Sequence, residues 1–388
     1  MGLSCMKKVR HVVIAIPCLN RGGTEMQTLC LVKALVFSGF RVTVLCYFEY
    51  DRAVVDEYRA AGGDVVLMDM VRSIGQLSFV GKLRNTIAGL KPDVVHVQYM
   101  TPGALAIVAA RLAGARRVLA TVHQPYSSWH SPLWKVLLRL SALLCDHFIA
   151  VSLAAESSWF GRSRDIADVP DSLLPKHFTL HNAVDVSCVQ VLAASEEAAR
   201  LRSGYAESGC FVFGYIGRLS HEKGADILFD AFELLAQRYA AVCLLVVGDG
   251  PERASLEHRY GVRQWWRRVT MAGRQDWENA MRHFAAMDAV VVPSRFEGFG
   301  LSAVEAMAAS LPVVASDAGG LGEIIAHGQN GLLFECGNVS GLLACMERLL
   351  LEPQTRRRLC LDARRRASDF DIELFNRKIR KLYNTPLS

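Results

Sequence analysis

The stretch AVVVPSRFEGFGLSAVEAM, residues 289–307, holds the pattern that decides the fold of this chain of 388 residues. Its first four residues are apolar, a glycine-rich loop follows, and LSAVEAM has the apolar spacing of a helix. A continuous apolar run, as opposed to an alternating one, predicts a strand that is buried on both faces. Such strands are typical of parallel sheets covered by helices, so the stretch predicts one strand–loop–helix unit.

The same unit recurs along both halves of the chain. Strand-length apolar runs in the first half are HVVIAIP, RVTVLCY, DVVLM, DVVHVQ, RVLATVH and HFIAVS, and those in the second half are FVFGYIG, AVCLLVVG, VTMAG, AVVVPS, PVVAS and GLLF. Helical patterns such as EMQTLCLVKALVFSG separate them. The alternation predicts an α/β protein with two Rossmann-like, doubly wound parallel-sheet domains, at residues 1–184 and 185–369. Because open α/β sheets bind ligands at the carboxyl ends of their strands, we expect the two domains to face a shared cleft.

Composition and charge narrow the class of protein. Hydrophobic residues make up 51% of the chain and charged residues 21%, which is typical of a globular enzyme. A net charge of +6 is too small to indicate nucleic-acid binding, but it suits anionic small molecules or an anionic membrane face. The 11 cysteines are scattered and form no CxxC pair. We therefore expect a cytoplasmic protein without disulfides or a zinc site.

Two apolar segments could be mistaken for membrane signals. HVVIAIPCL, from His11, is short and has no small-residue cleavage site after it, so it reads as a buried first strand and not as a signal peptide. LWKVLLRLSALLCDHFIAV, from Leu133, is interrupted by Lys135, Arg139 and Asp146 and should not span a bilayer. It predicts a helix followed by a strand, and the helix could also lie on a membrane surface.

The loop after the first strand, NRGGTE, is a candidate anion site. Gly22 and Gly23 would let the backbone approach a ligand where the next helix begins, and the free N–H groups of a helix N-terminus attract anions. The alternative is a tight turn without a ligand. The loop lacks the GxGxxG pattern, which disfavours a nicotinamide-dependent oxidoreductase, although Glu49 or Asp51 could imitate the ribose-binding acid of such enzymes.

Two histidines lie in predicted strands of the first half. His123 ends the strand RVLATVH and should project into the cleft, although a structural role is an equal alternative. His96 lies in the middle of a strand and is assigned to the core.

The second half offers cations at the end of its first strand. Arg218 and Lys223 lie five positions apart in the loop GRLSHEKG, with Gly217 and Gly224 beside them. Two cations at the carboxyl edge of a sheet are well placed to clamp a diphosphate, whereas ordinary surface charges would not need this glycine framing. The turn GDGP, residues 248–251, would add a wall of small residues.

The opening stretch adds two acids, Glu297 in its loop and Glu305 in the second turn of its helix. They do not share one helix face, but they could hold different parts of one ligand that lies across the helix N-terminus. Backbone N–H groups near Gly300 and Leu301 would then face the ligand's phosphates. The alternative for Glu297 is a structural capping role.

Taken together, these motifs resemble a known family. GRLSHEKGADIL, GDGPE, VVVPSRFEGFGLSAVEAMAASLPVVASDAGGLGEII and HGQNGLLF occur in the order found in family-4 glycosyltransferases of GT-B fold, and the RGGTE loop and the TVH strand end agree. The resemblance implies a retaining, hexosyltransferase-like transfer of a sugar from a nucleoside-diphosphate sugar, such as a UDP- or GDP-sugar, to a glycan or a lipid-linked acceptor. It also implies that a last helix, about residues 370–388, joins the first domain.

The resemblance assigns roles to the candidate residues. Arg218 and Lys223 would hold the diphosphate, the Gly22-Gly23 loop would approach its distal phosphate, and Glu305 would bind the ribose. Glu297 and His123 would contact the sugar. The backbone of Gly298, Phe299, Gly300 and Leu301 would line the pocket for sugar and diphosphate. The family's usual mechanism, front-face attack assisted by the departing phosphate, needs no enzyme nucleophile, and we expect no required metal or other cofactor.

Other interpretations stay open at this point. The DxD pattern Asp369-Phe370-Asp371 could bind a metal but is better explained by an N-cap of the last helix. The basic triplets at 356–358 and 364–366 could be a solvated helix face or could contact anionic lipid. A sugar-nucleotide epimerase and a non-catalytic sugar-nucleotide-binding protein are the alternative functions. The expected context is bacterial cell-surface polysaccharide or glycolipid synthesis, in the cytoplasm or peripherally on the membrane's cytoplasmic face.

Overall fold

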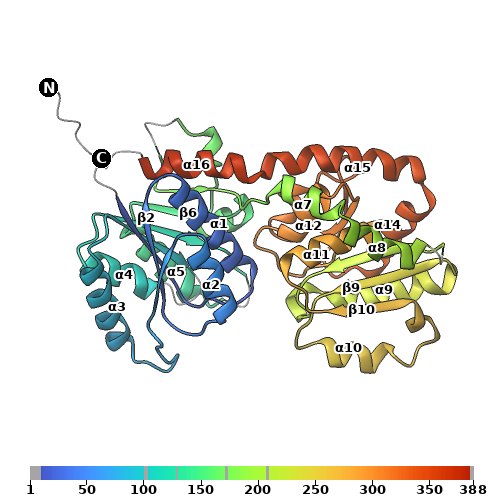
Figure 1. Cartoon of the computed structure of the whole chain (residues 1–388), viewed down its shortest axis with the longest axis horizontal. Coiled ribbons are helices and arrows are strands. Elements are labelled where there is room, and N and C mark those ends of the chain that lie inside the picture. The colour runs from blue at the N-terminus through green and yellow to red at the C-terminus, as the bar shows by residue number, and fades with distance from the viewer. Residues whose placement is uncertain (1–9, 100–103, 128–129, 171–173, 207–208, 385–388) are drawn as a thin grey trace. The chain divides into compact units, whose positions relative to one another are not determined.

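The computed structural model describes residues 10–99, 104–127, 130–170, 174–206 and 209–384, which fold into two compact units (Figure 1). Residues up to Ala183 and those from Glu373 onward form the first unit, and Val184–Ile372 form the second. Each unit contains one parallel sheet with helices packed on it, so the expected fold class, with two Rossmann-like domains, is confirmed.

The first unit has a seven-stranded sheet in the order β3-β2-β1-β4-β5-β6-β7, with every neighbouring pair parallel. Its strands are β1 (His11–Ile16), β2 (Arg41–Cys46), β3 (Asp64–Leu67), β4 (Val94–Tyr99), β5 (Arg117–Val122), β6 (His147–Ala150) and β7 (His177–Thr179). Its helices before the second unit are α1 (Gly23–Phe37), α2 (Arg52–Ala60), α3 (Gln76–Leu90), α4 (Ala104–Leu112), α5 (Pro132–Leu143) and α6 (Leu153–Phe160). All the apolar runs predicted as strands in this half are confirmed. The sequence pattern missed β7 because its sequence, HFT, has only one apolar residue and so forms no apolar run.

The second unit has a six-stranded parallel sheet in the order β10-β9-β8-β11-β12-β13. Its strands are β8 (Phe211–Ile216), β9 (Val242–Val247), β10 (Val269–Gly273), β11 (Ala289–Val292), β12 (Val313–Ser316) and β13 (Leu332–Phe334). Its helices are α7 (Val186–Ala193), α8 (Glu196–Ala206), α9 (Ala225–Arg238), α10 (Arg253–Tyr260), α11 (Trp277–His283), α12 (Leu301–Ala308), α13 (Leu321–Ile324), α14 (Val339–Leu351) and α15 (Pro353–Ala367).

The strands are buried as the continuous apolar runs predict. Every residue of β1, β5 and β9 is buried, because helices cover both faces of each sheet. The segment from Leu133 forms helix α5 followed by strand β6, as expected. In the part of the chain that the structure describes, no helix combines the length and the apolar character needed to cross a bilayer.

The last helix, α16 (Ile372–Asn384), packs in the first unit, where Tyr383 is fully buried. The Tyr383 hydroxyl lies 2.6 Å from Nδ1 of His96 in β4, and Nε2 of the same ring lies 2.7 Å from Oγ1 of Thr121. Burial lowers the pKa of His96 to about 3, so the ring is neutral, with one nitrogen donating and the other accepting. His96 is thus a satisfied core residue that attaches the end of the chain to the middle of the first sheet.

Replacing Tyr383 with Phe should destabilise the first unit by about 1–3 kcal/mol, because one buried nitrogen of His96 loses its partner. Hydrogen exchange measured by mass spectrometry in increasing urea checks this expectation. Peptides of β4 and β5 should lose protection at lower urea in the variant, and peptides of the second unit serve as the internal control. Unchanged protection of β4 would show that the hydroxyl does not hold the helix in place.

Candidate functional site

The loop between β8 and α9 carries the two predicted cations of the second unit. It passes through the 3₁₀ turn η2 (His221–Lys223) and reaches α9 at Gly224, whose φ of +64° is left-handed. A Cβ at Gly224 would lie 2.1 Å from the carbonyl oxygen of Pro293. The glycine therefore lets this loop press against the end of β11, where the second predicted group of residues begins.

Lys223 and Glu297 meet across these two loops. The Lys223 ammonium lies 2.8 Å from Oε2 of Glu297, and the Ser294 hydroxyl donates to the same oxygen at 3.0 Å. The side chains of Lys223 and Glu297 are 29% and 11% exposed, so the pair is largely shielded from water. Arg218, in contrast, pairs with Glu222 at 2.7 Å and is 66% exposed. The structure thus brings Lys223 to Glu297 and leaves the guanidinium of Arg218 exposed to solvent.

A second ion pair, not expected from the sequence, holds the same two loops together. Arg295 donates two hydrogen bonds of 2.6 Å to the carboxylate of Asp226 in α9 and one of 3.0 Å to the carbonyl of His221. Burial alone would raise the pKa of Asp226, but the hydrogen bonds and charge of Arg295 outweigh it and lower that pKa. A paired Arg–carboxylate fork fixes both distance and orientation, so it sets the position of the loop that carries Glu297.

Glycines also allow the loop after Glu297 to pack against the turn that precedes α13. Gly319 has a φ of +54°, and a Cβ there would lie 2.0 Å from the carbonyl oxygen of Glu297. Gly300, at φ +114°, is the N-cap of α12, and Leu301 is the first helical residue. Gly298 and Phe299 lead into this cap, with the Phe299 ring buried against Phe370 at 5.3 Å. Phe299 can therefore face a ligand only through its backbone.

Glu305 lies in α12 and is held by a tryptophan that the sequence did not single out. The Trp277 indole N–H, at the start of α11, donates to Oε1 of Glu305 at 2.9 Å. Burial raises the pKa of Glu305, and the hydrogen bond from Trp277 opposes this shift. The only sequence signal for Trp277 is an aromatic residue in the first turn after the predicted strand VTMAG.

Gly22 and Gly23 lie at the start of α1 in the first unit, with Gly22 as the N-cap. Gly22 has an ordinary extended φ of −145°, but a Cβ there would lie 2.6 Å from Oε2 of Glu25. Glu25 itself is 5% exposed. The need for glycine at position 22 therefore comes from the buried carboxylate behind the loop, and the predicted contact with a phosphate stays a prediction.

His123 lies at the carboxyl end of β5 and is buried. Its Nε2 lies 2.8 Å from Oε1 of Gln98, so this nitrogen carries the proton and donates. Among the described residues, Nδ1 of His123 and the side-chain nitrogen of Gln98 have no hydrogen-bond partner. The pair can thus accept one hydrogen bond from a ligand and donate another to it, which suits a hydroxyl group.

The neutral state of His123 predicts a pH dependence. Burial lowers its pKa to about 4, below the value of about 6.5 for an unfolded histidine, so between these values only the unfolded chain takes up the proton. The first unit should therefore lose stability as the pH falls through this window, by about 2 kcal/mol between pH 7 and pH 5. In the same exchange assay, His123→Asn should lose correspondingly less than the wild type, since all other groups titrate in both proteins. Equal losses would contradict the assignment.

No group of three or more metal-binding side chains occurs in the described parts of the chain. In the DxD pattern, Asp369 pairs with Arg366 at 2.8 Å, and Asp371 directly precedes the first residue of α16. The candidate residues thus lie on two units, with Gly22, Gly23 and His123 on the first and the others on the second.

Two family models match the chain. Glycosyl transferases group 1 matches residues 202–366, and Glycosyltransferase Family 4 matches residues 21–160. Glycogen synthase from Mycobacterium tuberculosis is 30% identical over 289 residues, 72% of this chain and 66% of its own length. A GDP-mannose-dependent alpha-(1-6)-phosphatidylinositol monomannoside mannosyltransferase from the same species is 29% identical over 76% of this chain and 77% of its own length.

Solved structures show the same fold. HepE from Anabaena, in complex with UDP-glucose, has a TM-score of 0.79 and 24% identity, covering 97% of this chain and all of the other. The lipopolysaccharide outer core galactosyltransferase WaaB has a TM-score of 0.70 and 17% identity, covering 97% of this chain and all of the other. The chain thus spans 66% of the length of the glycogen synthase. It spans 64% of the length of another relative, the 2-deoxystreptamine glucosyltransferase from Streptomyces kanamyceticus.

Proposed function

The chain belongs to the glycosyltransferases of group 1 and family 4, with the GT-B fold, and on that premise we propose that it transfers a sugar from a nucleoside-diphosphate sugar with retention of configuration. The acceptor in this proposal is a glycan or a lipid-linked sugar of cell-surface polysaccharide or glycolipid synthesis. The proposed donor is a UDP- or GDP-sugar, because HepE was crystallised with UDP-glucose and the similar mannosyltransferase depends on GDP-mannose.

The observation that carries the proposal is the shielded pair of Lys223 and Glu297 in front of α12. In the proposal, Lys223 and the more exposed Arg218 bind the diphosphate, and the N-terminal amides of α12 face its negative charge. Glu297 accepts hydrogen bonds from the sugar's hydroxyl groups, while its charge is balanced by Lys223. Glu305 accepts hydrogen bonds from the ribose.

The reaction breaks the bond between the sugar's anomeric carbon and the diphosphate oxygen, and forms one from that carbon to an acceptor oxygen. The diphosphate leaves with the bonding electron pair, so negative charge grows on its oxygens in the transition state. Fixed cations and helix amides stabilise that charge more than they stabilise the bound donor, and this difference lowers the barrier. The departing phosphate takes the acceptor's proton, so Glu297 is assigned neither a nucleophile's nor a base's role. We also propose that no metal is required.

Replacing Glu297 with Gln should lower the rate of sugar transfer by roughly 100-fold, because a neutral amide binds the sugar and balances Lys223 less well. The wild type is first incubated with UDP-, GDP- and ADP-sugars, and donor binding is detected by thermal stabilisation and by slow release of the nucleoside diphosphate. The donor that binds is then used for the comparison of variants.

A matched control is Glu347→Gln, which neutralises another carboxylate paired with a cation at 2.8 Å in the same unit but on α14. It should retain wild-type turnover. Binding of none of the donors would refute the proposal. If the protein binds a donor but Glu297→Gln changes no turnover, the result would favour a non-catalytic binding protein. If the wild type converts the donor to an isomeric sugar nucleotide without an acceptor, the result would favour an epimerase.

Trp277→Phe should raise the KM for the donor about tenfold with little change in kcat, because it removes a hydrogen bond to the carboxylate that binds the ribose. The variant should also move the acid limb of donor binding to higher pH, since the Trp277 bond lowers the pKa of Glu305. Trp266→Phe is the control, because the Trp266 ring stacks on Phe229, with 5.7 Å between the ring centroids, and is not the donor to Glu305. A uniform loss of kcat in Trp277→Phe at unchanged KM would contradict this positioning role.

A further inference from the structure

Helix α5 of the first unit leaves a long apolar face open to water. Its exposed apolar residues, together with the one that follows it, are 36% to 68% exposed: Leu133, Val136, Leu137, Leu140, Leu143 and Leu144. At about 100° per residue they cover an arc of roughly 120°, and the opposite side of the helix, with Leu138 and Ala142, packs in the core. We call these six residues the α5 stripe. A contiguous exposed apolar face of this kind is typical of an interaction site.

Cations border the stripe along one edge. Lys135 and Arg139 lie on α5 between the exposed and the buried side. The Arg139 guanidinium donates to the carbonyl of Trp159 at 2.7 Å, and the Lys135 ammonium lies 4.7 Å from the centre of the Tyr126 ring. The sequence from Gln124 to Cys145 contains no aspartate or glutamate. The helix thus combines an apolar face with positive charge only.

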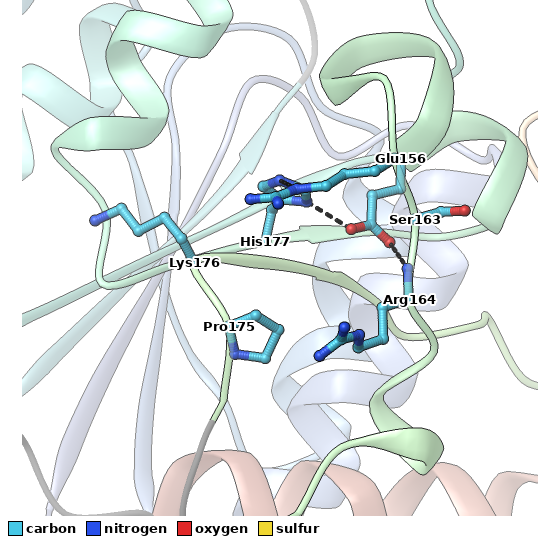
Figure 2. Close-up of a pocket in the computed structure, with 7 residues that line it drawn as sticks. Glu156, Ser163, Arg164, Pro175, Lys176 and His177 are labelled. Carbon is cyan, nitrogen blue, oxygen red and sulfur yellow. Dashed lines mark hydrogen bonds and ion pairs between the residues drawn. The ribbon is translucent and has the colours of Figure 1, made fainter.

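The first unit also has a basic pocket, and Figure 2 shows the side chains that line it. It has a volume of about 240 Å³ and is lined by Glu156, Arg162, Ser163, Arg164, Pro175, Lys176 and His177. The Lys176 ammonium donates to the carbonyl of Leu143 at 3.2 Å and to that of Cys145, so Lys176 joins the segment that lines this pocket to the end of the α5 stripe.

Among the described residues that line the pocket, Glu156 is the one carboxylate, and it is already satisfied inside the protein. Glu156 is 1% exposed and accepts hydrogen bonds from His177 at 2.6 Å, from Thr179 at 2.7 Å and from the backbone N–H of Arg164 at 3.0 Å, two of which Figure 2 shows. The Arg164 guanidinium, in contrast, has no hydrogen-bond or ion-pair partner among the described residues. Within the described part of the chain, the one hydrogen bond of the Arg162 guanidinium is to the His177 ring, at 3.5 Å. The charge left over in the pocket is therefore positive.

We propose that the α5 stripe and the basic pocket form one docking face for an anionic lipid bilayer. The stripe inserts at the boundary between headgroups and acyl chains, while Lys135 and the pocket residues Arg162 and Arg164 bind headgroup phosphates. This inference rests on the proposed function and deepens it. It places the enzyme on the membrane surface that would carry a lipid-linked acceptor.

A second copy of the chain, as the partner of the α5 stripe, and helix α15, as the surface that contacts lipid, fit the structure less well. A second copy of the chain would bring two faces of the same positive charge together, which is unfavourable. The basic triplets of α15, the other candidate for lipid contact, are largely used within the protein. Arg356, Arg358 and Arg366 donate to backbone carbonyls at 2.7, 3.0 and 2.6 Å, and within α15 Leu361 is the one large apolar side chain that is exposed.

Sedimentation with lipid vesicles tests the proposal. The wild type should bind vesicles of phosphatidylcholine mixed with phosphatidylglycerol, and bind more weakly to phosphatidylcholine alone. The double variant Leu137→Glu with Leu140→Glu should bind at least about tenfold more weakly to both, because it places charge in the apolar face. The double variant Arg162→Gln with Arg164→Gln should lose about fivefold per cation on anionic vesicles only.

Matched controls keep the result specific. Leu77→Glu changes a leucine of α3 that is even more exposed, and Arg357→Gln with Arg364→Gln removes two exposed cations from α15; both should bind like the wild type. Unfolding temperature and donor binding confirm that each variant is folded.

The proposal is overturned if the wild type does not bind anionic vesicles, or if the stripe variant binds as well as the wild type. It is also overturned if the stripe variant differs from the wild type only in oligomeric state, which would identify a second copy as the occupant. Vesicle binding is measured without a sugar donor, and release of the nucleoside diphosphate is measured without vesicles. Failure of this inference is therefore distinguishable from failure of the proposed glycosyl transfer.

Discussion

Close approach of backbone to backbone at the carboxyl edge of the second sheet is the constraint on which the rest of this unit depends. A Cβ at Gly248, after β9, would lie 1.9 Å from the carbonyl of Gly217, and one at Gly319 would lie 2.0 Å from that of Glu297. Neither position has room for a side chain, and both have a positive φ. With these close contacts in place, Lys223 and Glu297 come within hydrogen-bond distance of each other.

The resulting site is rigid where the proposed chemistry needs fixed charge. Arg295 and Asp226 hold the loop of Glu297 to the start of α9, and Trp277 holds Glu305 from a third element. Preorganised groups of this kind need no reorganisation when charge moves to the diphosphate, which is the main source of electrostatic catalysis.

The fold could be predicted from the sequence because buried parallel strands leave a strong signal. Continuous apolar runs such as AVVV at 289–292 predict every described strand except β7, whose sequence HFT alternates polar and apolar residues over three positions only. The candidate site was reached in part: Lys223 and Glu297 were singled out as ligand-binding residues, but their pairing was not. Arg295, Asp226 and Trp277 were missed because their roles depend on contacts between residues 28 to 69 positions apart, and no local pattern carries that information.

The order of the units along the chain has a consequence for synthesis. Val184–Ile372 form a complete sheet and lie between two parts of the first unit, whose last helix brings Tyr383 to His96. During synthesis, every residue of the second unit is added before the helix that completes the first. Until Tyr383 emerges, a neutral histidine in the central strands has one nitrogen unsatisfied, and the groove for α16 stays open. The first domain to be translated is therefore the last to be completed.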